Sequence, residues 1–334
     1  MGATWQWWGA SGCVKMVLVG DESRWRSPTI ADMPQIAALA SRCDAMDGAL
    51  EATLVDRLAD RLGWDSDIGD VSRVVVAGNR IVAAGWASAT VTISGYRDLL
   101  YAFADPARHQ LTGEVMRWPV EHSPACAVSG SVQRIERVLA PASPDLPDAP
   151  LRLYASLGFT RIYVEHEMAS ALDGPSHAAT PAGVTIKKWT RDLHPNVRDA
   201  YNDAFRDRGF AGYAPEEWDR VFRPEDITAE QSFVALRDDR VVGFVFSTVL
   251  DDPDDWIDPA IRGSGWIDTL GVVRAARGRG VATALLASAI DEMRRARASR
   301  VVLRINQDNK RAMRVYRRLG FELVRRHVVY ARRV

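Results

Sequence analysis

Residues 265–289 read GWIDTLGVVRAARGRGVATALLASA, and this stretch decides how the second half of the chain folds. A short apolar run over residues 266–273 ends at an Arg-Gly-Arg-Gly turn, residues 277–280. Apolar residues then recur at helical spacing over residues 282–293. The pattern therefore predicts a strand, a glycine-rich turn and a helix.

The turn between this strand and helix has the properties of an anion site. Gly278 and Gly280 let the backbone approach a ligand closely, and the first turn of a helix has four N–H groups without internal partners. Together with the charges of Arg277 and Arg279, these donors can hold a pyrophosphate. A glycine turn before a helix can equally be only a tight connection, and the residues after the helix decide between the two.

The residues after this helix have the order found in one superfamily. A β-branched strand is expected over residues 300–305. Arg277-x-x-Gly280-x-Ala282 resembles the Q/R-x-x-G-x-G/A pyrophosphate loop of the GNAT acyl-CoA N-acyltransferases. The resemblance covers residues 181–334 and includes the C-terminal signature of that family, which here consists of Asn309, Ala312, Tyr316, Gly320 and Phe321.

Bulk composition limits the classes of function. The chain has 334 residues, enough for two domains, and its 43 basic and 43 acidic residues leave no surplus for a nucleic-acid footprint. Cys13, Cys43 and Cys126 are too widely spaced for a disulfide framework or a zinc site, so we expect no metal. Without an apolar run of membrane-spanning length or a secretory pattern, we expect a cytoplasmic monomer or homodimer that does not bind membranes.

The two halves of the chain repeat each other. Residues 79–82 (NRIV) align with residues 239–242 (DRVV), and residues 153–159 (LYASLGF) align with residues 315–321 (VYRRLGF). This predicts a tandem repeat of a unit of about 150 residues, the size of one domain. The expected parts are a disordered tail (1–24), an N-terminal domain (25–170), a linker (171–183) and a C-terminal catalytic domain (184–334).

The resemblance also implies the fold. It implies the α/β (α+β) class, with two tandem GNAT folds, each a mixed, mostly antiparallel central sheet flanked by helices. Within these folds the sequence predicts helices near residues 33–43, 51–62 and 196–206. Gly78-Asn79 favours a hairpin because both residues tolerate positive φ, and a second hairpin is expected around Asp238-Asp239.

The N-terminal half departs from the family pattern. Leu111 occupies the position of Gly280, where its side chain would obstruct the approach of the backbone to a pyrophosphate. Pro147 and Pro150 replace the Asn and Ala of the signature, and prolines disfavour a helix. We therefore expect a structural domain that packs on the second one, with a residual or regulatory CoA site as the alternative.

Acyl transfer from a thioester to an amine requires a deprotonated nucleophile, a stabilised oxyanion and a proton for the departing thiolate. The resemblance implies acetyl-CoA as the acyl donor, with its pantetheine arm along the strand and its phosphates on the turn. The backbone amide near Leu270 would face the thioester carbonyl. The residues implied to bind the donor are Leu270, Gly271, Val272, Arg277, Gly278, Arg279, Gly280, Val281, Ala282, Thr283 and Asn309.

Tyr316 lies at the family's general-acid position and would protonate the leaving sulfur. Most tyrosines only bury a ring and bond through the hydroxyl. This one, however, lies seven residues after Asn309 and four before Gly320, which favours the catalytic interpretation.

The base is harder to assign. Many GNAT enzymes have a glutamate eleven positions before the loop arginine, where this chain has Trp266. Asp268 lies two residues further along the strand, and the alternation of side chains would point it the same way. It could receive the proton directly or through water, bind the cationic amine, or only cap a neighbouring backbone group.

The expected acceptor is a primary amine of a small molecule, such as an amino sugar, an aminoglycoside or a natural-product intermediate, acetylated by direct transfer in a ternary complex. Aromatic residues within 201–222 and an acidic loop at 251–258 are candidates for recognising it, although such residues more often form core and a solvated loop. The alternatives are a protein N-acetyltransferase and a CoA-binding sensor without turnover.

Overall fold

The structure is a computed structural model and describes residues 23–47, 71–92, 95–143, 146, 148–172, 178–208, 211–250 and 263–334. Most of the predicted tail, the predicted helix at 51–62 and the acidic loop at 251–258 lie outside these residues. The chain divides into two compact units, Met1–Tyr163 with Val328–Val334, and Val164–His327. The predicted domain and linker boundaries stay predictions. Within the described residues, no helix has the length and apolar character that a membrane crossing needs.

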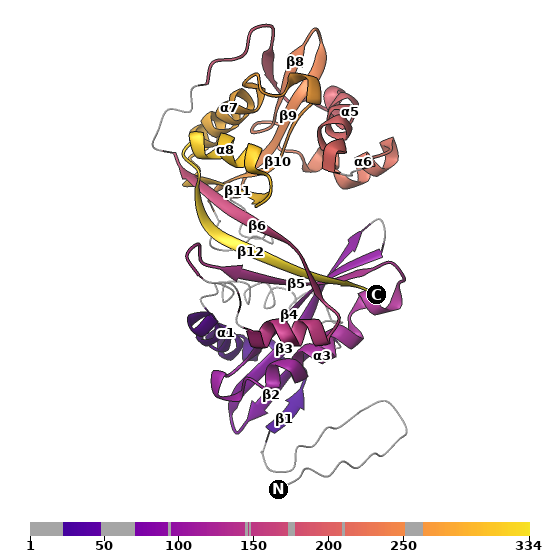
Figure 1. Ribbon diagram of the computed structural model, residues 1–334, viewed down its shortest axis with the longest axis vertical. Helices are drawn as coiled ribbons and strands as arrows, with labels where there is room; N and C mark the ends of the chain where they lie inside the picture. Colours follow the sequence, from indigo (N-terminus) through magenta and orange to yellow (C-terminus); the bar gives the residue numbers. More distant parts are fainter. Residues whose placement is uncertain are drawn as a thin grey trace. The chain divides into compact units, whose positions relative to one another are not determined.

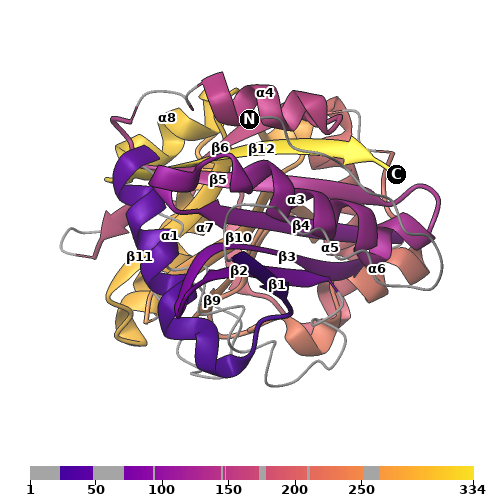
Figure 2. The same cartoon turned by 90° about the horizontal axis from the view of Figure 1, so that it is seen from below.

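The first unit is built on a sheet in which β1 to β4 are antiparallel neighbours and β4 and β5 are parallel (Figure 1). Successive residues of a strand point to opposite faces, so Val74 packs under α1 while Val75 packs under α3. Figure 2 shows α1 running across the strands. The elements of this unit are β1 (Ser23–Arg26), α1 (Met33–Asp47), β2 (Ser72–Ala77), β3 (Arg80–Thr92), β4 (Gly95–Ala104), α3 (Leu111–His122), β5 (Val132–Leu139) and α4 (Asp148–Ser156).

The second unit has the strand order β12-β6-β11-β10-β9-β8-β7. The β10–β11 pair is parallel, and the pairs from β10 to β7 and between β11 and β6 are antiparallel. Both units thus have the mixed, mostly antiparallel sheet with flanking helices that was predicted. The elements are β6 (Thr160–Ala171), β7 (Thr185–Lys188), α5 (His194–Phe205), α6 (Pro215–Val221), β8 (Phe233–Arg237), β9 (Arg240–Val249), β10 (Gly265–Val272), α7 (Val281–Arg295), β11 (Arg300–Asn306), α8 (Lys310–Arg318) and β12 (Glu322–Arg333).

Strand β9 separates the two cores of the second unit. Val245 packs on the face covered by α7, together with Leu285. Phe244 and Phe246 pack on the other face, with Trp218 of α6 in an aromatic cluster. Each fully buried side chain of this size contributes about 1.5–3 kcal/mol. Of the aromatic series predicted within residues 201–222, Trp218 is core, and Tyr201, Phe205, Tyr213 and Phe222 pack against this core while partly exposed.

The turn residues of the two predicted hairpins adopt the conformations that hairpins need. Gly78, between β2 and β3, has a φ of 58°, and Asp238 and Asp239, between β8 and β9, have φ values of 48° and 57°. Positive φ at the first central residue, as in Gly78-Asn79, or at both, as in Asp238-Asp239, matches the right-handed twist of the flanking strands. Both hairpins are confirmed.

One local expectation is wrong. Prolines were expected to disfavour a helix before Gly158, yet α4 forms over Asp148–Ser156. Pro150 lies in its first turn, where a backbone N–H would have no partner inside the helix. A proline at such a position costs no helical hydrogen bond, so the helix tolerates it.

A charged cluster is buried in the second unit. Glu167 of β6 is fully buried and lies 3.1 Å from His327 Nε2, 3.4 Å from Arg304 Nε and 3.6 Å from Arg325 Nε. Desolvation raises the pKa of Glu167, but the hydrogen bond with His327 and the charges of Arg325 and Arg304 outweigh it, so the pKa lies below its ordinary value. Three strands, β6, β11 and β12, are thereby held together by one carboxylate.

We expect Glu167→Gln to lower the free energy of unfolding by about 3 kcal/mol at neutral pH, because it leaves the partly buried guanidinium groups of Arg304 and Arg325 without their counter-charge. A carboxyl whose pKa is lower in the folded state stabilises above its unfolded pKa, and this stabilisation is lost as pH falls through the folded pKa. Denaturant unfolding from pH 7 to pH 3 should therefore show a smaller decrease in the free energy of unfolding for the variant than for the wild type. Glu322→Gln, which removes an exposed carboxylate at the start of β12, is the control and should change little. Equal acid sensitivity of wild type and Glu167→Gln would contradict the assignment.

Candidate active site

The parallel strands β10 and β11 separate half-way along their length. They pair only from Gly265 to Ile267, opposite residues 301–303. Strand β10 stays paired with β9 up to Val272, with an irregularity in the register between Ile267 and Thr269. Alternate backbone N–H and C=O groups of a strand point to either side, so beyond Ile267 those facing away from β9 are directed into the gap.

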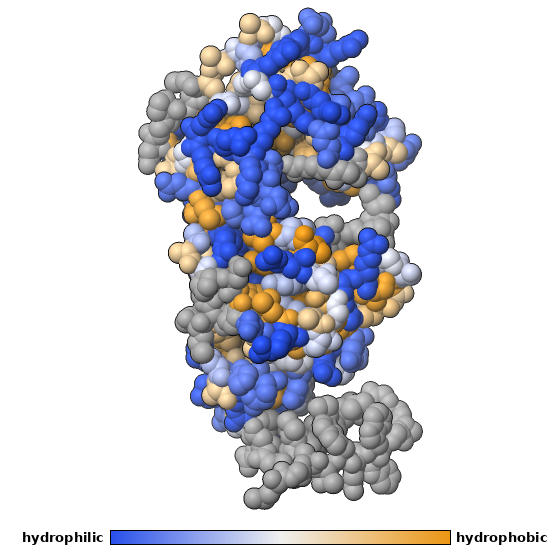
Figure 3. Space-filling model, in the orientation of Figure 1, coloured by the Kyte–Doolittle hydropathy of each residue, from blue (hydrophilic) through white to orange (hydrophobic). Residues whose placement is uncertain are grey.

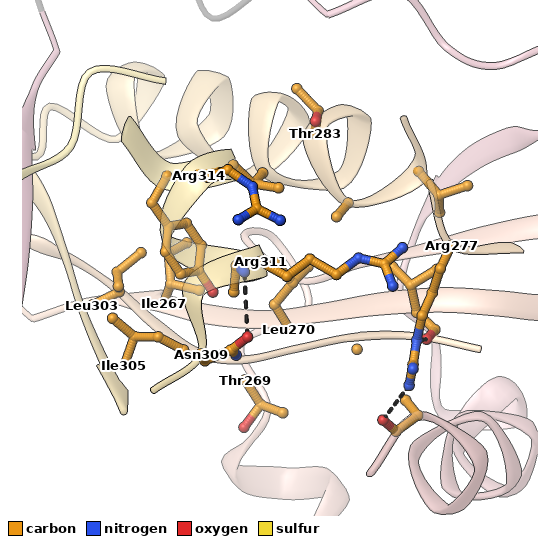
Figure 4. Close-up of a pocket in the computed structure, with 18 of the residues that line it drawn as sticks. Ile267, Thr269, Leu270, Arg277, Thr283, Leu303, Ile305, Asn309, Arg311 and Arg314 are labelled. Atoms are coloured by element: carbon orange, nitrogen blue, oxygen red, sulfur yellow. Dashed lines mark hydrogen bonds between the residues drawn. The ribbon is translucent and has the colours of Figure 1, made fainter. Parts of the chain in front are cut away.

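The gap opens into a cavity of about 780 Å³ that lies wholly within the second unit (Figure 4). Residues of β10, the glycine turn, α7, β11 and α8 line it, with further contributions from α5 and β6. Its volume is in the range of pockets that hold small-molecule ligands. Most residues predicted to bind the donor meet here: Leu270, Gly271, Val272, Arg277, Gly278, Gly280, Val281, Ala282, Thr283 and Asn309 line the cavity, as do Asp268 and Tyr316. Arg279 is exposed and is not among the lining residues.

The glycine turn requires its glycines for backbone reasons. Gly278 and Gly280 have φ values of 76° and 85°, in the left-handed region that side chains disfavour. Gly280 is the N-cap of α7, and the first hydrogen bond inside the helix runs from the N–H of Ala284 to the carbonyl of Gly280. The N–H groups before Ala284 at the start of α7 therefore lack partners within the helix and can serve an anion in the cavity.

The side chain of Arg277 is engaged with the protein itself. Its guanidinium donates to the carbonyls of Val272, at 3.1 Å, and Ala204, at 2.7 Å. A third contact, 2.6 Å long, reaches Asp207 just after α5 and is marked in Figure 4. The hydrogen bond from Arg277 lowers the pKa of the Asp207 carboxyl, and the charge of Arg274 lowers it further. Arg277 thus ties the glycine turn to the end of α5.

Other cations in the cavity were missed by the sequence interpretation. Arg311, Arg314 and Arg318 of α8 line it, and their spacing of three and four residues places them on one side of the helix. Arg304 of β11 and Glu165 of β6 also line it. Figure 3 shows strongly hydrophilic residues gathered over α8, in agreement with this series. The sequence shows the spacing of these arginines, but it does not show that this side of α8 faces the cavity.

Helix α8 positions Tyr316 and Asn309. The side-chain oxygen Oδ1 of Asn309 caps the helix by accepting a hydrogen bond from the N–H of Ala312, at 3.3 Å. Tyr316 is buried, with its ring 5.8 Å from that of Phe321, and it borders the cavity. The packing of the ring fixes the direction of the hydroxyl.

Asp268 lies at the irregularity in β10, which interrupts the alternation used to predict its direction. Its side chain is exposed to the open cavity, yet the surrounding protein atoms desolvate it and raise its pKa. Hydrogen bonds from Thr269 and Trp266 act in the opposite direction, and that from the Thr269 hydroxyl is 2.9 Å long. A carboxylate with a raised pKa facing a cavity is suited to accept a proton.

The parallel strands β4 and β5 of the first unit also separate, pairing only from Arg97 to Leu100, but the register irregularity and the glycine turn are missing from the described residues there. The pairing of β3 with β4 runs from Ala83 to Thr92 without a shift in register. Of the described residues between β4 and α3, none has a positive φ, and Leu111 begins α3 with its side chain buried against Val75 and Val82. Tyr154, the counterpart of Tyr316, is buried and accepts a hydrogen bond from Arg137, 3.1 Å long.

Comparison with known families finds a match for part of the chain. Residues 194–321 match the model described as Acetyltransferase (GNAT) family. The matched range includes β10, the glycine turn, β11 and α8, which form most of the cavity wall. Residues 194–321, which lie within the second unit, are thus similar to the GNAT acetyltransferases.

Two kinds of curated acetyltransferase are similar to this chain. N-alpha-acetyltransferase 30 of Schizosaccharomyces pombe is 39% identical over 92 residues, which cover 28% of this chain and 57% of that protein. The mycothiol acetyltransferase of Corynebacterium efficiens is 31% identical over 204 residues, covering 56% and 62%. The chain thus spans less than two thirds of the length of these two relatives. The mycothiol acetyltransferase of Kocuria rhizophila is 27% identical over 318 residues, covering 89% of this chain and 94% of that protein.

A solved structure is similar in fold over most of the chain. It is described as a tandem GNAT protein from the clavulanic acid biosynthesis pathway (without AcCoA), and it covers 93% of this chain and 98% of its own. The TM-score is 0.60 at 16% sequence identity, so the likeness concerns the fold alone. The predicted tandem arrangement of two GNAT folds is confirmed.

Proposed function

We propose that the second unit transfers an acetyl group from acetyl-CoA to a primary amine of a small molecule, such as an amino sugar, an aminoglycoside or a natural-product intermediate, in a ternary complex. The proposal rests on one observation: the proposed base, the proposed acid and the glycine turn all line the same cavity along β10. Asp268 and the glycine turn both line it, and the strand between them spans roughly 13 Å at about 3.3 Å per residue. Tyr316 borders the same space.

The donor would lie along the free side of β10. Backbone groups of Leu270, Gly271 and Val272 can bind its amide-containing arm, as an added strand would. The unpartnered N–H groups of the glycine turn and of the start of α7 would hold its phosphates. Asn309 would contact the arm from the opposite wall of the cavity.

In the reaction, the amine nitrogen attacks the thioester carbonyl carbon and forms the new C–N bond. A backbone N–H near Leu270 would stabilise the resulting oxyanion. The carbon–sulfur bond then breaks, and the Tyr316 hydroxyl donates its proton to the departing sulfur. Asp268 takes the proton that the amine loses, and exchange with solvent restores both side chains.

The Thr269 hydroxyl provides a test of Asp268 as the base. Its hydrogen bond lowers the pKa of Asp268, so Thr269→Val should raise this pKa. Because the base acts in its deprotonated form, the acidic limb of the kcat/KM–pH profile should move to higher pH. Asp268→Asn should remove that limb and lower kcat/KM about 10²-fold or more. An unchanged profile in both variants would assign the proton to another acceptor.

The nature of the acceptor is decided by measuring thiol release with a panel of amines. Small-molecule amines should support turnover, and peptides with free N-termini should not. The alignment with the Kocuria rhizophila protein over most of both chains favours one second candidate, the acceptor of the mycothiol acetyltransferases. Trp266, at a position where the family often has a glutamate, argues against it. Binding of acetyl-CoA without turnover for any amine would show a sensor instead of an enzyme.

A further inference from the structure

The guanidinium of Arg277, the arginine of the motif, already binds protein oxygens and is not available to the pyrophosphate expected on the glycine turn. All three nitrogens of the Arg277 guanidinium donate to protein oxygens, at 2.6–3.1 Å, on Val272, Ala204 and Asp207. A diphosphate that displaced these contacts would leave the Asp207 carboxylate without its main partner and detach the turn from α5. Rearranging Arg277 to bind phosphate would therefore disturb the turn that it holds.

A second guanidinium lies over the same turn from the other wall of the cavity. A β-carbon placed on Gly278 would be 3.7 Å from a terminal nitrogen of Arg311. Figure 4 shows the Arg311 side chain extending from α8 toward the turn that carries Arg277. Arg311 is exposed, and no described residue forms a hydrogen bond or ion pair with its side chain. Arg314, from the next turn of α8, lines the cavity as well.

We propose that Arg311, and not the motif residue Arg277, supplies the charged contact to the pyrophosphate of the donor, while Arg277 braces the turn. The inference rests on the proposed function, since it assumes a CoA thioester in this cavity. Guanidinium groups bind phosphate oxygens through paired, charge-assisted hydrogen bonds, which the neutral amides of the turn do not provide. The donor is thereby gripped between α7 and α8.

The experiment compares three ligands by calorimetry: CoA, 3′-dephospho-CoA and pantetheine. Arg311→Ala should weaken the binding of CoA and of 3′-dephospho-CoA by about 10- to 100-fold, because one charge-assisted contact is lost. Pantetheine, which has no pyrophosphate, should bind wild type and variant alike. Arg317→Ala is the matched control, since Arg317 is exposed on the same helix but does not line the cavity. It should leave all three affinities unchanged.

The outcomes separate this inference from the proposed function. If the wild type binds CoA and Arg311→Ala binds it equally well, the role of Arg311 is refuted and the function stands. If Arg311→Ala weakens the binding of CoA but not that of 3′-dephospho-CoA, the side chain binds the 3′-phosphate. The proposal is then also refuted. A wild type that binds none of the nucleotides would overturn both. Because Arg311 is exposed, the thermal midpoint of the ligand-free variant should match that of the wild type.

Discussion

Replacing Tyr316 by phenylalanine is expected to lower kcat for acetyl transfer by about 10²- to 10⁴-fold, the usual contribution of a positioned general acid. The substitution removes only the hydroxyl oxygen. The ring stays buried and keeps its packing against Phe321, 5.8 Å away, so the cavity should keep its shape. Acetyl-CoA should therefore bind with unchanged affinity. Steady-state thiol release measures kcat, and calorimetry measures binding.

The first unit supplies a matched control for this substitution. Tyr154 occupies the corresponding place, is equally buried, and bonds through its hydroxyl to Arg137. Tyr154→Phe should cost stability, about 1 kcal/mol for one hydrogen bond, and should leave kcat unchanged. If Tyr316→Phe keeps more than half of the wild-type kcat, another group protonates the sulfur.

Local features of the candidate site could be predicted from the sequence because they depend on neighbouring residues. The strand, turn and helix around Gly280 follow from apolar spacing and from the conformations that only glycine adopts freely. The signature from Asn309 to Phe321 likewise encodes a capped helix with one buried face. Each pattern lies within one continuous stretch of roughly 30 residues or fewer, so a single sequence displays it.

Features that depend on distant contacts could not be predicted. The orientation of Arg277 is set by Asp207 and Ala204, about seventy residues earlier in the chain. The irregularity at Asp268 arises between β9 and β10, and the alternation of side chains in β10 alone gives no sign of it. The three cavity-lining arginines of α8 were readable as one side of a helix, but only the packing of Met313 and Tyr316 in the core shows which side meets the cavity.

Gly280→Leu, which places in the second unit the residue found at the corresponding position of the first, is expected to abolish measurable acetyl-CoA binding. A leucine at φ 85° is strained by roughly 1–2 kcal/mol, and its side chain would occupy the place where the phosphates approach the turn. The wild type should bind one acetyl-CoA per chain by calorimetry. Leu111→Gly should not create a second site, because the turn before α3 has no positive φ in its described residues.

Gly183→Leu distinguishes backbone strain from loss of the ligand site. Gly183 has a φ of 69°, lies outside the cavity, and has open space where a β-carbon would be. Both leucine variants should lower the midpoint of thermal unfolding by a similar amount. Only Gly280→Leu should lose the ability to bind acetyl-CoA. The nearest atom to a β-carbon on Gly280 is Pro181 Cγ at 3.6 Å, so the β-carbon itself makes only an ordinary contact. Two acetyl-CoA molecules bound per chain would show that a further site exists elsewhere in the chain. A Gly280→Leu variant that binds acetyl-CoA with wild-type affinity would place the donor away from the glycine turn.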